Sequence, residues 1–230
     1  TLIWNKKKSN FLLFLEIFLA FIVLFAVFTF VTPNLRSYNS PLGYDPSDVW
    51  VSYLEIDEQV DSLTNIEMKR QLKQELNAFS EITGVSFSGF SLPFSNNNNA
   101  FGHRDNGFSL FAYVLEADHD YGAVMDVNVL EGRMFNETDA HAKYKSVVIT
   151  KGLKDRYFAD TEVVDSIFVM AGEGESKIVG VIDAYKYMGE FADENRIMIQ
   201  YENQLESRNF AMVMELNGEV PPTFEEEVNN

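Results

Sequence analysis

Residues 49–56 (VWVSYLEI), 66–79 (IEMKRQLKQELNAF) and 85–92 (VSFSGFSL) decide the fold of this 230-residue chain. The outer two segments alternate between apolar and polar residues and are rich in β-branched and aromatic side chains, which predicts strands. The middle segment has its apolar residues on one helical face, and Thr64 with Glu67 three residues later has the spacing of a capping box. The stretch therefore predicts a β-α-β unit, and a right-handed crossover would make its two strands parallel.

The segments that follow predict a mixed set of elements. Apolar β-branched runs indicate strands, and clusters of Gly, Pro and Asn indicate the connections. We predict strands at 108–117, 146–150, 163–170, 177–184, 196–201 and 210–216, short helices at 121–127 and 151–158, a loop at 93–107, a turn at 136–139 and a hairpin turn at 172–174. The fold class predicted is α+β.

The last ten residues predict the start of another helix. Pro221 and Pro222 are followed by Thr-Phe-Glu-Glu-Glu, and proline followed by acidic residues is typical of a helix N-terminus. With the strand at 210–216, this indicates a second β-α-β unit whose helix and closing strand lie beyond residue 230. The first residue is Thr rather than Met, so we expect the sequence to be truncated at both ends.

Residues 11–31 (FLLFLEIFLAFIVLFAVFTFV) are unlike the rest, with 21 residues and a single charge. As a helix they would extend about 30 Å, the hydrocarbon thickness of a bilayer. The apolar run is longer than that of a buried core helix. It is also longer than the apolar region of a signal peptide, and Thr32-Pro33-Asn34 is a poor cleavage site. We therefore predict a transmembrane helix.

The charges beside this helix predict its orientation. Lys6, Lys7 and Lys8 precede it and only Arg36 follows closely. The positive-inside rule then makes residues 1–10 a cytoplasmic flank and places the chain after the helix outside. Residues 32–48 contain three prolines and a glycine and predict a linker, which leaves residues 49–230 as the extracytoplasmic domain.

Glu16 is the one charge within the apolar run. Its side chain can extend toward the lysine-rich interface. Alternatively, it contacts another transmembrane helix, because intramembrane charges are costly and usually face protein. The sequence leaves both interpretations open.

Composition excludes several classes of protein. The formal net charge is −17, and all but three of the 18 basic and all but one of the 35 acidic residues lie after residue 32. The outer part is thus strongly acidic, which argues against nucleic-acid binding and against adsorption to anionic lipid. The absence of Cys excludes disulfides, thiolate metal sites and a Cys nucleophile.

No catalytic, metal-binding or cofactor-binding site is predicted. His103, His119 and His141 lack metal-ligand spacing, and the chain has no HExxH, GxSxG or P-loop motif. Asp118, His119 and Asp120 are adjacent, which predicts a solvated loop whose side chains point apart. We therefore predict a protein that is not an enzyme and needs no cofactor.

Several stretches together resemble bacterial ABC-transporter permeases of the MacB/FtsX type. Residues 2–30 resemble the first transmembrane helix of that family, and VLEGRMFNETD at 129–139 resembles its segment with Gly-Arg-x-Phe and a later Asp. SVVITKGLKDRYF at 146–158 and KIVGVIDAYKY at 177–187 resemble the strand-helix and strand segments that follow. Thr150 stands where Asn is common in the family.

The resemblance implies an architecture, a location and partners. A MacB-like periplasmic core domain would follow the first transmembrane helix, with a porter-like subdomain of two β-α-β units and an inserted mixed α/β subdomain. Such permeases lie in the bacterial cytoplasmic membrane, form homodimers or heterodimers, and work with a separate cytoplasmic ABC ATPase. Many transmit ATP-driven motion across the membrane rather than pass substrate through it.

The resemblance also marks individual positions as structural. These are Gly132, Arg133, Phe135, Asp139, Gly180 and Asp183. From the residues alone, Gly132 and Arg133 fit a tight turn in which Arg133 pairs with an acid such as Asp139.

Two further functions compete with the permease. A single-pass receptor would use the outer domain to sense a small ligand and would continue into one more helix and a signalling domain. A membrane-anchored hydrolase would need a deep pocket with a perturbed acid or base, and no motif supports one.

Overall fold

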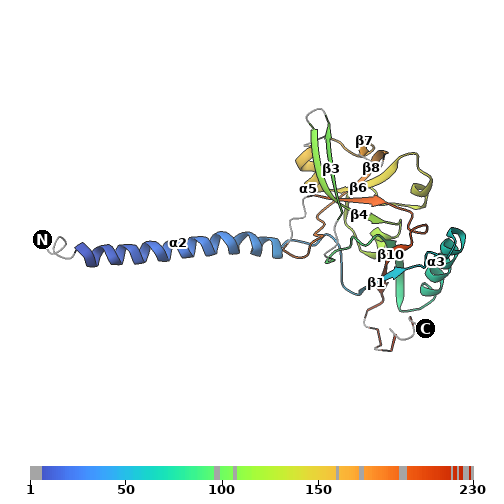
Figure 1. Cartoon of the computed structure of the whole chain (residues 1–230), viewed down its shortest axis with the longest axis horizontal. Helices are drawn as coiled ribbons and strands as arrows, with labels where there is room; N and C mark the ends of the chain where they lie inside the picture. Colours follow the sequence, from blue (N-terminus) through green and yellow to red (C-terminus); the bar gives the residue numbers. More distant parts are fainter. Residues whose placement is uncertain are drawn as a thin grey trace. The chain divides into compact units, whose positions relative to one another are not determined.

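The structure is a computed structural model. It describes residues 7–95, 99–105, 108–158, 161–170, 174–191, 196–218, 220–221, 223–224 and 228. The chain divides into two compact units, residues 1–40 and residues 41–230. Figure 1 shows the helix of the first unit and the mixed α/β second unit.

The first unit is one helix, α2 (Lys7–Tyr38). Its segment Asn10–Tyr38 is long and apolar enough to cross a membrane. The most apolar stretch of this segment is not buried within the protein. The helix continues through Pro33, so the prediction of a linker from residue 32 is wrong at its start. Pro33 has no backbone N–H and cannot donate a hydrogen bond, but the helix continues past it. The Asn34 side chain donates a hydrogen bond to the carbonyl oxygen of Phe30 at 2.7 Å.

The predicted β-α-β unit is present in the second unit. It consists of β1 (Val49–Glu55), α3 (Ser62–Leu76) and β2 (Ile82–Ser88). β10 (Asn209–Leu216) lies between the two strands and is antiparallel to both, so β1 and β2 are parallel, as predicted, but are not paired to each other. We call β1, α3, β2 and β10 the small half.

The helix α3 begins earlier than predicted. Asp61 is its N-cap, and the Asp61 carboxylate accepts hydrogen bonds from the backbone amides of Leu63 and Thr64 at 3.0 and 3.1 Å. Thr64, the predicted cap, lies inside the first turn and donates its hydroxyl to Asp61 at 2.5 Å. A carboxylate is a strong N-cap because a charged acceptor binds the free helix amides more strongly than a neutral one.

The other strands form what we call the large half, in the order β4-β9-β6-β8-β5, with β3 paired to β4 and β7 to β8. Figure 1 shows it above the small half. The strands are β3 (Asn99–Asp105), β4 (Phe108–Ala117), β5 (Val129–Gly132), β6 (Lys145–Thr150), β7 (Ile167–Met170), β8 (Gly174–Ile182) and β9 (Ile197–Tyr201). The helical segments are α4 (Tyr121–Val124), the 3-10 helix η1 (Glu137–His141) and α5 (Lys151–Tyr157).

Two predictions in the large half were wrong. The loop predicted at 93–107 contains β3, because pairing with β4 satisfies its backbone and Phe101 is buried in the core. The strand predicted from residue 163 begins at Ile167, because Asp165 has a φ of +69° and interrupts the extended chain. β7 and β8 pair as the predicted hairpin does, and of the turn predicted at 172–174 only Gly174, the first residue of β8, lies within the described residues.

The central strand β6 explains the two-sided core of the large half. Val148 packs into one apolar cluster, while its neighbours Val147 and Ile149 pack into another. Alternate residues of a strand point to opposite faces, so both faces of the sheet are covered. The small half has a third cluster, in which the ring of Phe224 contacts those of Trp50 and Phe79. Most of the helix predicted after Pro221 falls outside the described residues.

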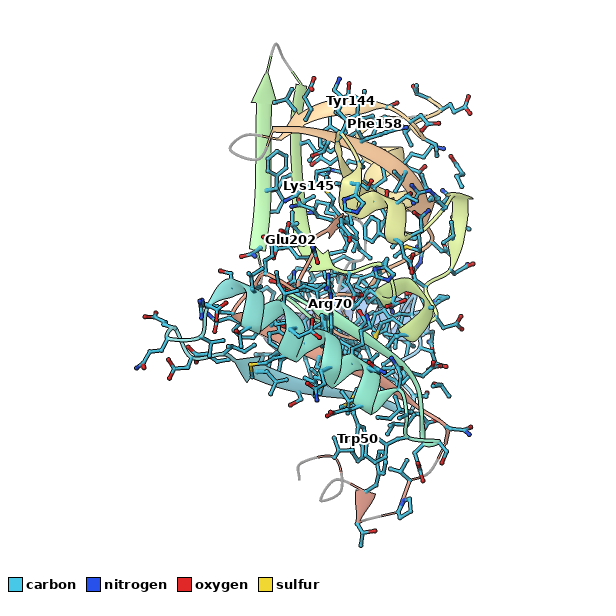
Figure 2. All side chains as sticks on the ribbon, turned by 90° about the vertical axis from the view of Figure 1, so that its right-hand side faces the viewer. Trp50, Arg70, Tyr144, Lys145, Phe158 and Glu202 are labelled. Carbon is cyan, nitrogen blue, oxygen red and sulfur yellow. The ribbon has the colours of Figure 1, made fainter. Side chains whose placement is uncertain are left out.

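The two halves share little backbone pairing. In the described part of the chain, β2 and β4 pair at one position, Ser88 with Ala117. Side chains therefore have to supply much of the contact that holds the small half against the large half. Figure 2 views this contact from the α3 side, with Arg70 on α3 and with Lys145 and Glu202 in the large half.

Candidate functional site

Residues 42–45, which we call the anchor segment, lie at the start of the second unit. The backbone amide of Lys186 donates to the carbonyl oxygen of Leu42 at 2.9 Å, and the Tyr44 hydroxyl donates to the carbonyl oxygen of Lys186 at 3.1 Å. The amide of Asp45 donates to the carbonyl oxygen of Met125 at 2.9 Å. The anchor segment is thus bound to two segments that are distant in sequence.

Gly43 lets this segment lie directly against the domain. Its φ is +88°, and a Cβ atom there would lie 1.7 Å from the carbonyl oxygen of Ala184. No side chain can be accommodated at that distance. The linker predicted at 32–48 is therefore partly helix and partly a tightly packed segment, because Gly43 serves close packing rather than freedom of motion.

Buried tyrosines complete the anchorage. The hydroxyls of Tyr121 and Tyr185 are 2.5 Å apart, and the rings of Tyr44 and Tyr185 have centroids 4.8 Å apart. All three side chains are buried. Burial raises the pKa of each hydroxyl well above its ordinary value, so the cluster is neutral at physiological pH. The neutral rings pack the anchor segment against the domain.

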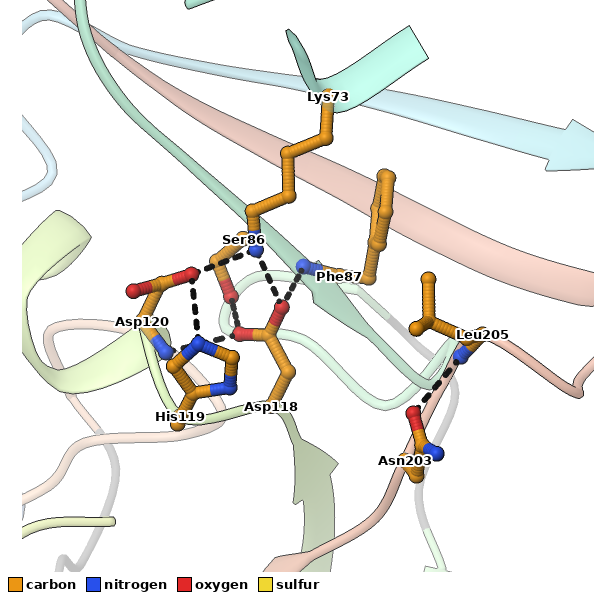
Figure 3. Close-up of polar contacts among 8 residues, drawn as sticks. All are labelled: Lys73, Ser86, Phe87, Asp118, His119, Asp120, Asn203 and Leu205. Carbon is orange, nitrogen blue, oxygen red and sulfur yellow. Dashed lines mark hydrogen bonds and ion pairs between the residues drawn. The ribbon is translucent and has the colours of Figure 1, made fainter. Parts of the chain in front are cut away.

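A second group of contacts joins the small half to the large half (Figure 3). Lys73 extends from α3, and its Nζ lies 2.9 Å from Asp118 Oδ2 and 2.6 Å from Asp120 Oδ2. Asp118 also accepts hydrogen bonds from the Ser86 hydroxyl at 2.7 Å and from the Phe87 amide at 3.0 Å. Both β2 and α3 are thereby tied to the turn that follows β4.

The charge on Lys73 is retained in this environment. Burial by itself would lower the pKa of Lys73, but the attraction of the Asp118 and Asp120 carboxylates outweighs it and raises the pKa. The prediction of a solvated loop whose side chains point apart is wrong for the two aspartates. Asp120 donates its backbone amide to Asp118 at 3.1 Å, and this turn brings both carboxylates to one lysine.

These residues border an open cleft of about 500 Å³ between α3 and the large half. His119 lines it, with Nε2 3.4 Å from Asp120, and so does His141 at the end of η1. His103 lies apart, in β3. Among the described residues, no group of three or more His, Asp or Glu side chains could hold a metal ion.

The positions marked by the family resemblance lie mostly around β5 and β8. Gly132 pairs with Gly180, and a Cβ on Gly180 would lie 2.2 Å from the carbonyl oxygen of Arg133. Arg133 pairs with Asp139, as its position predicted. Its Nη1 lies 2.7 Å from Asp139 Oδ2, and its Nη2 lies 2.9 Å from Asp139 Oδ1. Ser146 also donates to Asp139 at 2.6 Å. These contacts support a structural role.

The Asp139 carboxylate of this pair is partly shielded from water. Burial by itself would raise the pKa of Asp139, but the hydrogen bonds from Arg133, Ser146 and the Asn136 amide lower it overall. Asn136 caps η1 in a capping box with Asp139, so the turn predicted at 136–139 is a capped 3-10 helix.

The remaining marked residues are more scattered. The ring of Phe135 packs on the ring of Tyr201, with the two ring centroids 5.6 Å apart. Asp183 donates its amide to the carbonyl oxygen of Asn128 at 3.1 Å. Glu16 is exposed on α2, outside the second unit.

The sequence analysis missed the anchor segment and Lys73. Gly43 followed by Tyr44 between prolines was a signal, because a glycine needed at φ > 0 beside an aromatic ring favours packing over a flexible linker. Lys73 had no comparable signal. Its partners follow 45 and 47 residues later, and the pairing depends on how β4 ends beside α3.

Comparison with known proteins gives a consistent result. No curated protein matches the chain. The periplasmic region of MacB from Actinobacillus actinomycetemcomitans is similar in structure, with a TM-score of 0.52, 13% identity and coverage of 84% of this chain and 83% of that one. The extracellular domain of the noncanonic ABC-type transporter YknZ from Gram-positive bacteria has a TM-score of 0.50, 14% identity and coverage of 76% and 86%.

At such identities the likeness shows the fold, and the family follows from the sequence match. The MacB-like periplasmic core domain family matches residues 11–230, which include the apolar helix and the domain after it. The predicted family and fold class are therefore confirmed. This chain belongs to the family of MacB-like periplasmic core domains of ABC-transporter permeases.

Proposed function

We propose that this chain is a noncatalytic permease subunit of an ABC transport system, and that its outer domain couples cytoplasmic ATP hydrolysis to movement outside the membrane. The observation that carries the proposal is the anchor segment. Two backbone groups, the Leu42 carbonyl and the Asp45 amide, and the Tyr44 hydroxyl form hydrogen bonds to the domain soon after the apolar helix ends. A displacement of the helix would therefore reach the core of the domain rather than be absorbed by a loose linker.

The contact between the halves supports the same function. Lys73 and its two aspartates tie the small half to the large half, where the backbone pairing is sparse. A force applied at the anchor segment, which is bound to the large half through Lys186 and Met125, would then also move α3 and β2. The domain would respond largely as one body.

The partners and the orientation complete the proposal. ATP hydrolysis would come from a separate cytoplasmic ABC ATPase, since residues 1–230 contain no P-loop that could supply it within them. Lys6, Lys7 and Lys8 favour a cytoplasmic N-terminus in the bacterial inner membrane, with the domain outside. The permease would act as a dimer, either with itself or with a second permease. The family match favours this function over that of a single-pass receptor.

The test compares motion with the native connection between the apolar helix and the anchor segment and with that connection lengthened. The permease and its ATPase are reconstituted in nanodiscs, and a spin label is placed on Ile167→Cys, an exposed position in a chain that otherwise has no Cys. We expect ATP to change the distance between labels in the two subunits. A six-residue Gly-Ser insertion between Ser40 and Pro41 should abolish the change while ATPase activity persists.

The matched control is the same insertion between Glu58 and Gln59, in the exposed loop before α3. It should leave the distance change intact. A distance change that survives the insertion after Ser40, or one that is absent from the unmodified permease while the ATPase turns over, would contradict the proposal.

A further inference from the structure

Two loops of the second unit hold three large apolar side chains in an exposed position. These are Phe94 from the β2–β3 connection and Met188 and Phe191 from the β8–β9 connection, with exposed fractions of 55%, 50% and 62%. We call them the apolar loop patch. Isolated exposed apolar residues are ordinary, but several on adjoining loops indicate a surface that is covered in use.

The two loops are bound to each other, so the exposure is built into the fold. The Phe94 amide donates to the carbonyl oxygen of Tyr187 at 3.1 Å. Gly189 lies beneath the Phe94 ring, where an added Cβ would be 3.2 Å from Cε1. Phe94 itself has a φ of +61°, which is rare for a bulky residue and costs free energy. The surrounding contacts thus hold this ring outward in a strained backbone conformation.

The same loops bind the anchor segment. Lys186 contacts both Leu42 and Tyr44 through its backbone, and the rings of Tyr44 and Phe94 meet edge to face with centroids 6.5 Å apart. The patch therefore adjoins the point where the chain arrives from the apolar helix.

Chain length limits how far this point can be from a bilayer. The apolar run ends at Val31, and the helix continues to Tyr38, which adds about 10 Å at 1.5 Å per residue. Four further residues to Leu42 can span at most about 14 Å. The headgroup region extends about 5–8 Å beyond the hydrocarbon on each side. The patch is thus tethered within reach of the membrane interface.

We propose that the apolar loop patch inserts into the interfacial region of the bilayer and seats the outer domain on the membrane. The lipid surface it fits is zwitterionic. The domain carries a large excess of acidic residues, and Glu190 lies within the patch, so anionic headgroups would repel it. Phenylalanine and methionine would instead bury apolar surface at the boundary between headgroups and acyl chains. The proposal does not depend on an ATPase partner.

The absence of Cys allows a direct test with single labels. An environment-sensitive fluorophore is attached to Met188→Cys in the full chain, in phosphatidylcholine vesicles in which the same label on Leu24→Cys is quenched by lipid-borne quenchers. We expect the label at position 188 to be quenched by shallow-depth quenchers. Adding Phe191→Asp should lower that quenching by about twofold or more, because it removes apolar contact with the lipid.

Val169→Cys is the matched control. Val169 is similarly exposed, at 54%, but it lies in β7 beside the start of β8, whereas the anchor segment adjoins the end of β8. The two ends of β8 are roughly 25 Å apart along the strand. Equal quenching at positions 188 and 169 would overturn the proposal. So would a blue shift at position 188 that depends on the protein-to-lipid ratio and occurs without lipid quenching, because it would identify a second copy of this chain as the covering partner.

Discussion

At the scale of single residues, three glycines and one buried cation decide how the domain is held together. Gly43 permits the chain to lie against Ala184, and Gly132 and Gly180 permit β5 and β8 to approach each other. Lys69 on α3 is 1% exposed and donates to the carbonyl oxygens of Gln204 and Ser207, above the ring of Phe210. At each of these positions, the residue type fits the space or the hydrogen-bond acceptors that surround it.

Gly43→Ala should destabilise the second unit, because the new Cβ would overlap the carbonyl of Ala184 and force the anchor segment away. We expect a loss of more than about 2 kcal/mol in the free energy of unfolding. Denaturant titration of the full chain in detergent measures it. Gly218→Ala is the control, because Gly218 also has a positive φ but no atom near its Cβ position, and it should cost only about 1 kcal/mol.

Lys69 should make the stability of the domain depend on pH. Burial lowers the pKa of Lys69 to about 8, below the value of about 10.4 for an unfolded chain. The folded state therefore binds this proton less tightly than the unfolded state. The contribution of Lys69 is least favourable below pH 8 and improves as the pH rises from 8 toward 10.4, by up to about 3 kcal/mol.

The measurement is the difference in unfolding free energy between the wild type and Lys69→Met from pH 7 to pH 10. It should shift in favour of the wild type as the pH rises, and effects of the buried tyrosines cancel because both proteins contain them. Arg70→Met, at the exposed neighbouring position on α3, is the control. A difference that does not vary with pH would show that Lys69 is not held as a desolvated cation.

At the scale of elements, α3 is the part that links the halves. Its buried side packs on the small sheet, and Lys73 reaches the turn after β4. The position of β10 between β1 and β2 matters equally, because it makes the last described strand the centre of the small half. The small half therefore depends on residues from both ends of the domain.

Lys73→Met should destabilise the contact between the halves, because it leaves the buried carboxylate of Asp118 without its cation. A double-mutant cycle with Asp118→Asn should give a coupling free energy of about 1 kcal/mol or more. The control is the cycle for Lys151 and Asp155, a solvent-exposed pair within α5, whose coupling should be close to zero. Equal couplings in the two cycles would show that Lys73 contributes no more than a surface ion pair.

At the scale of the whole molecule, the charge is distributed unevenly. An apolar helix precedes a domain that contains all but one of the 35 acidic residues. Such a domain repels itself, and the few ion pairs that cross between its elements offset only part of this repulsion. Salt should therefore act on the domain mainly by screening repulsion.

Raising NaCl from about 10 mM to about 150 mM, which shortens the screening length from roughly 30 Å to 8 Å, should raise the melting temperature of the second unit. Thermal unfolding of the full chain followed by circular dichroism measures it, with an equal osmolality of sucrose as the control for general exclusion effects. A melting temperature that falls with salt would mean that attractive pairs such as Lys73 with Asp118 dominate the electrostatics of the fold.

Local sequence patterns predicted most of the strands and helices. β1 and β4 begin where the alternation begins, and the spacing of Gly132, Arg133 and Asp139 predicted their contact, because strand periodicity and short-range pairing depend on neighbouring residues. β3 was missed because its polar residues are extended only by virtue of their partner strand. The cap of α3 was misplaced because Asp61 caps the helix three residues before Thr64, whose hydroxyl donates to the Asp61 carboxylate.

By itself, the sequence determined the apolar helix, the acidic outer domain, the β-α-β start and the family, because length, charge and periodicity are properties of the chain. Only the tertiary structure decided that β10 separates β1 from β2, that Gly43 and Tyr44 anchor the chain, that Lys73 joins two aspartates from the large half, and that the apolar loop patch adjoins the anchor segment. The physical reason is that these contacts join residues far apart in sequence. Their geometry depends on how the sheet brings the ends of separate strands together.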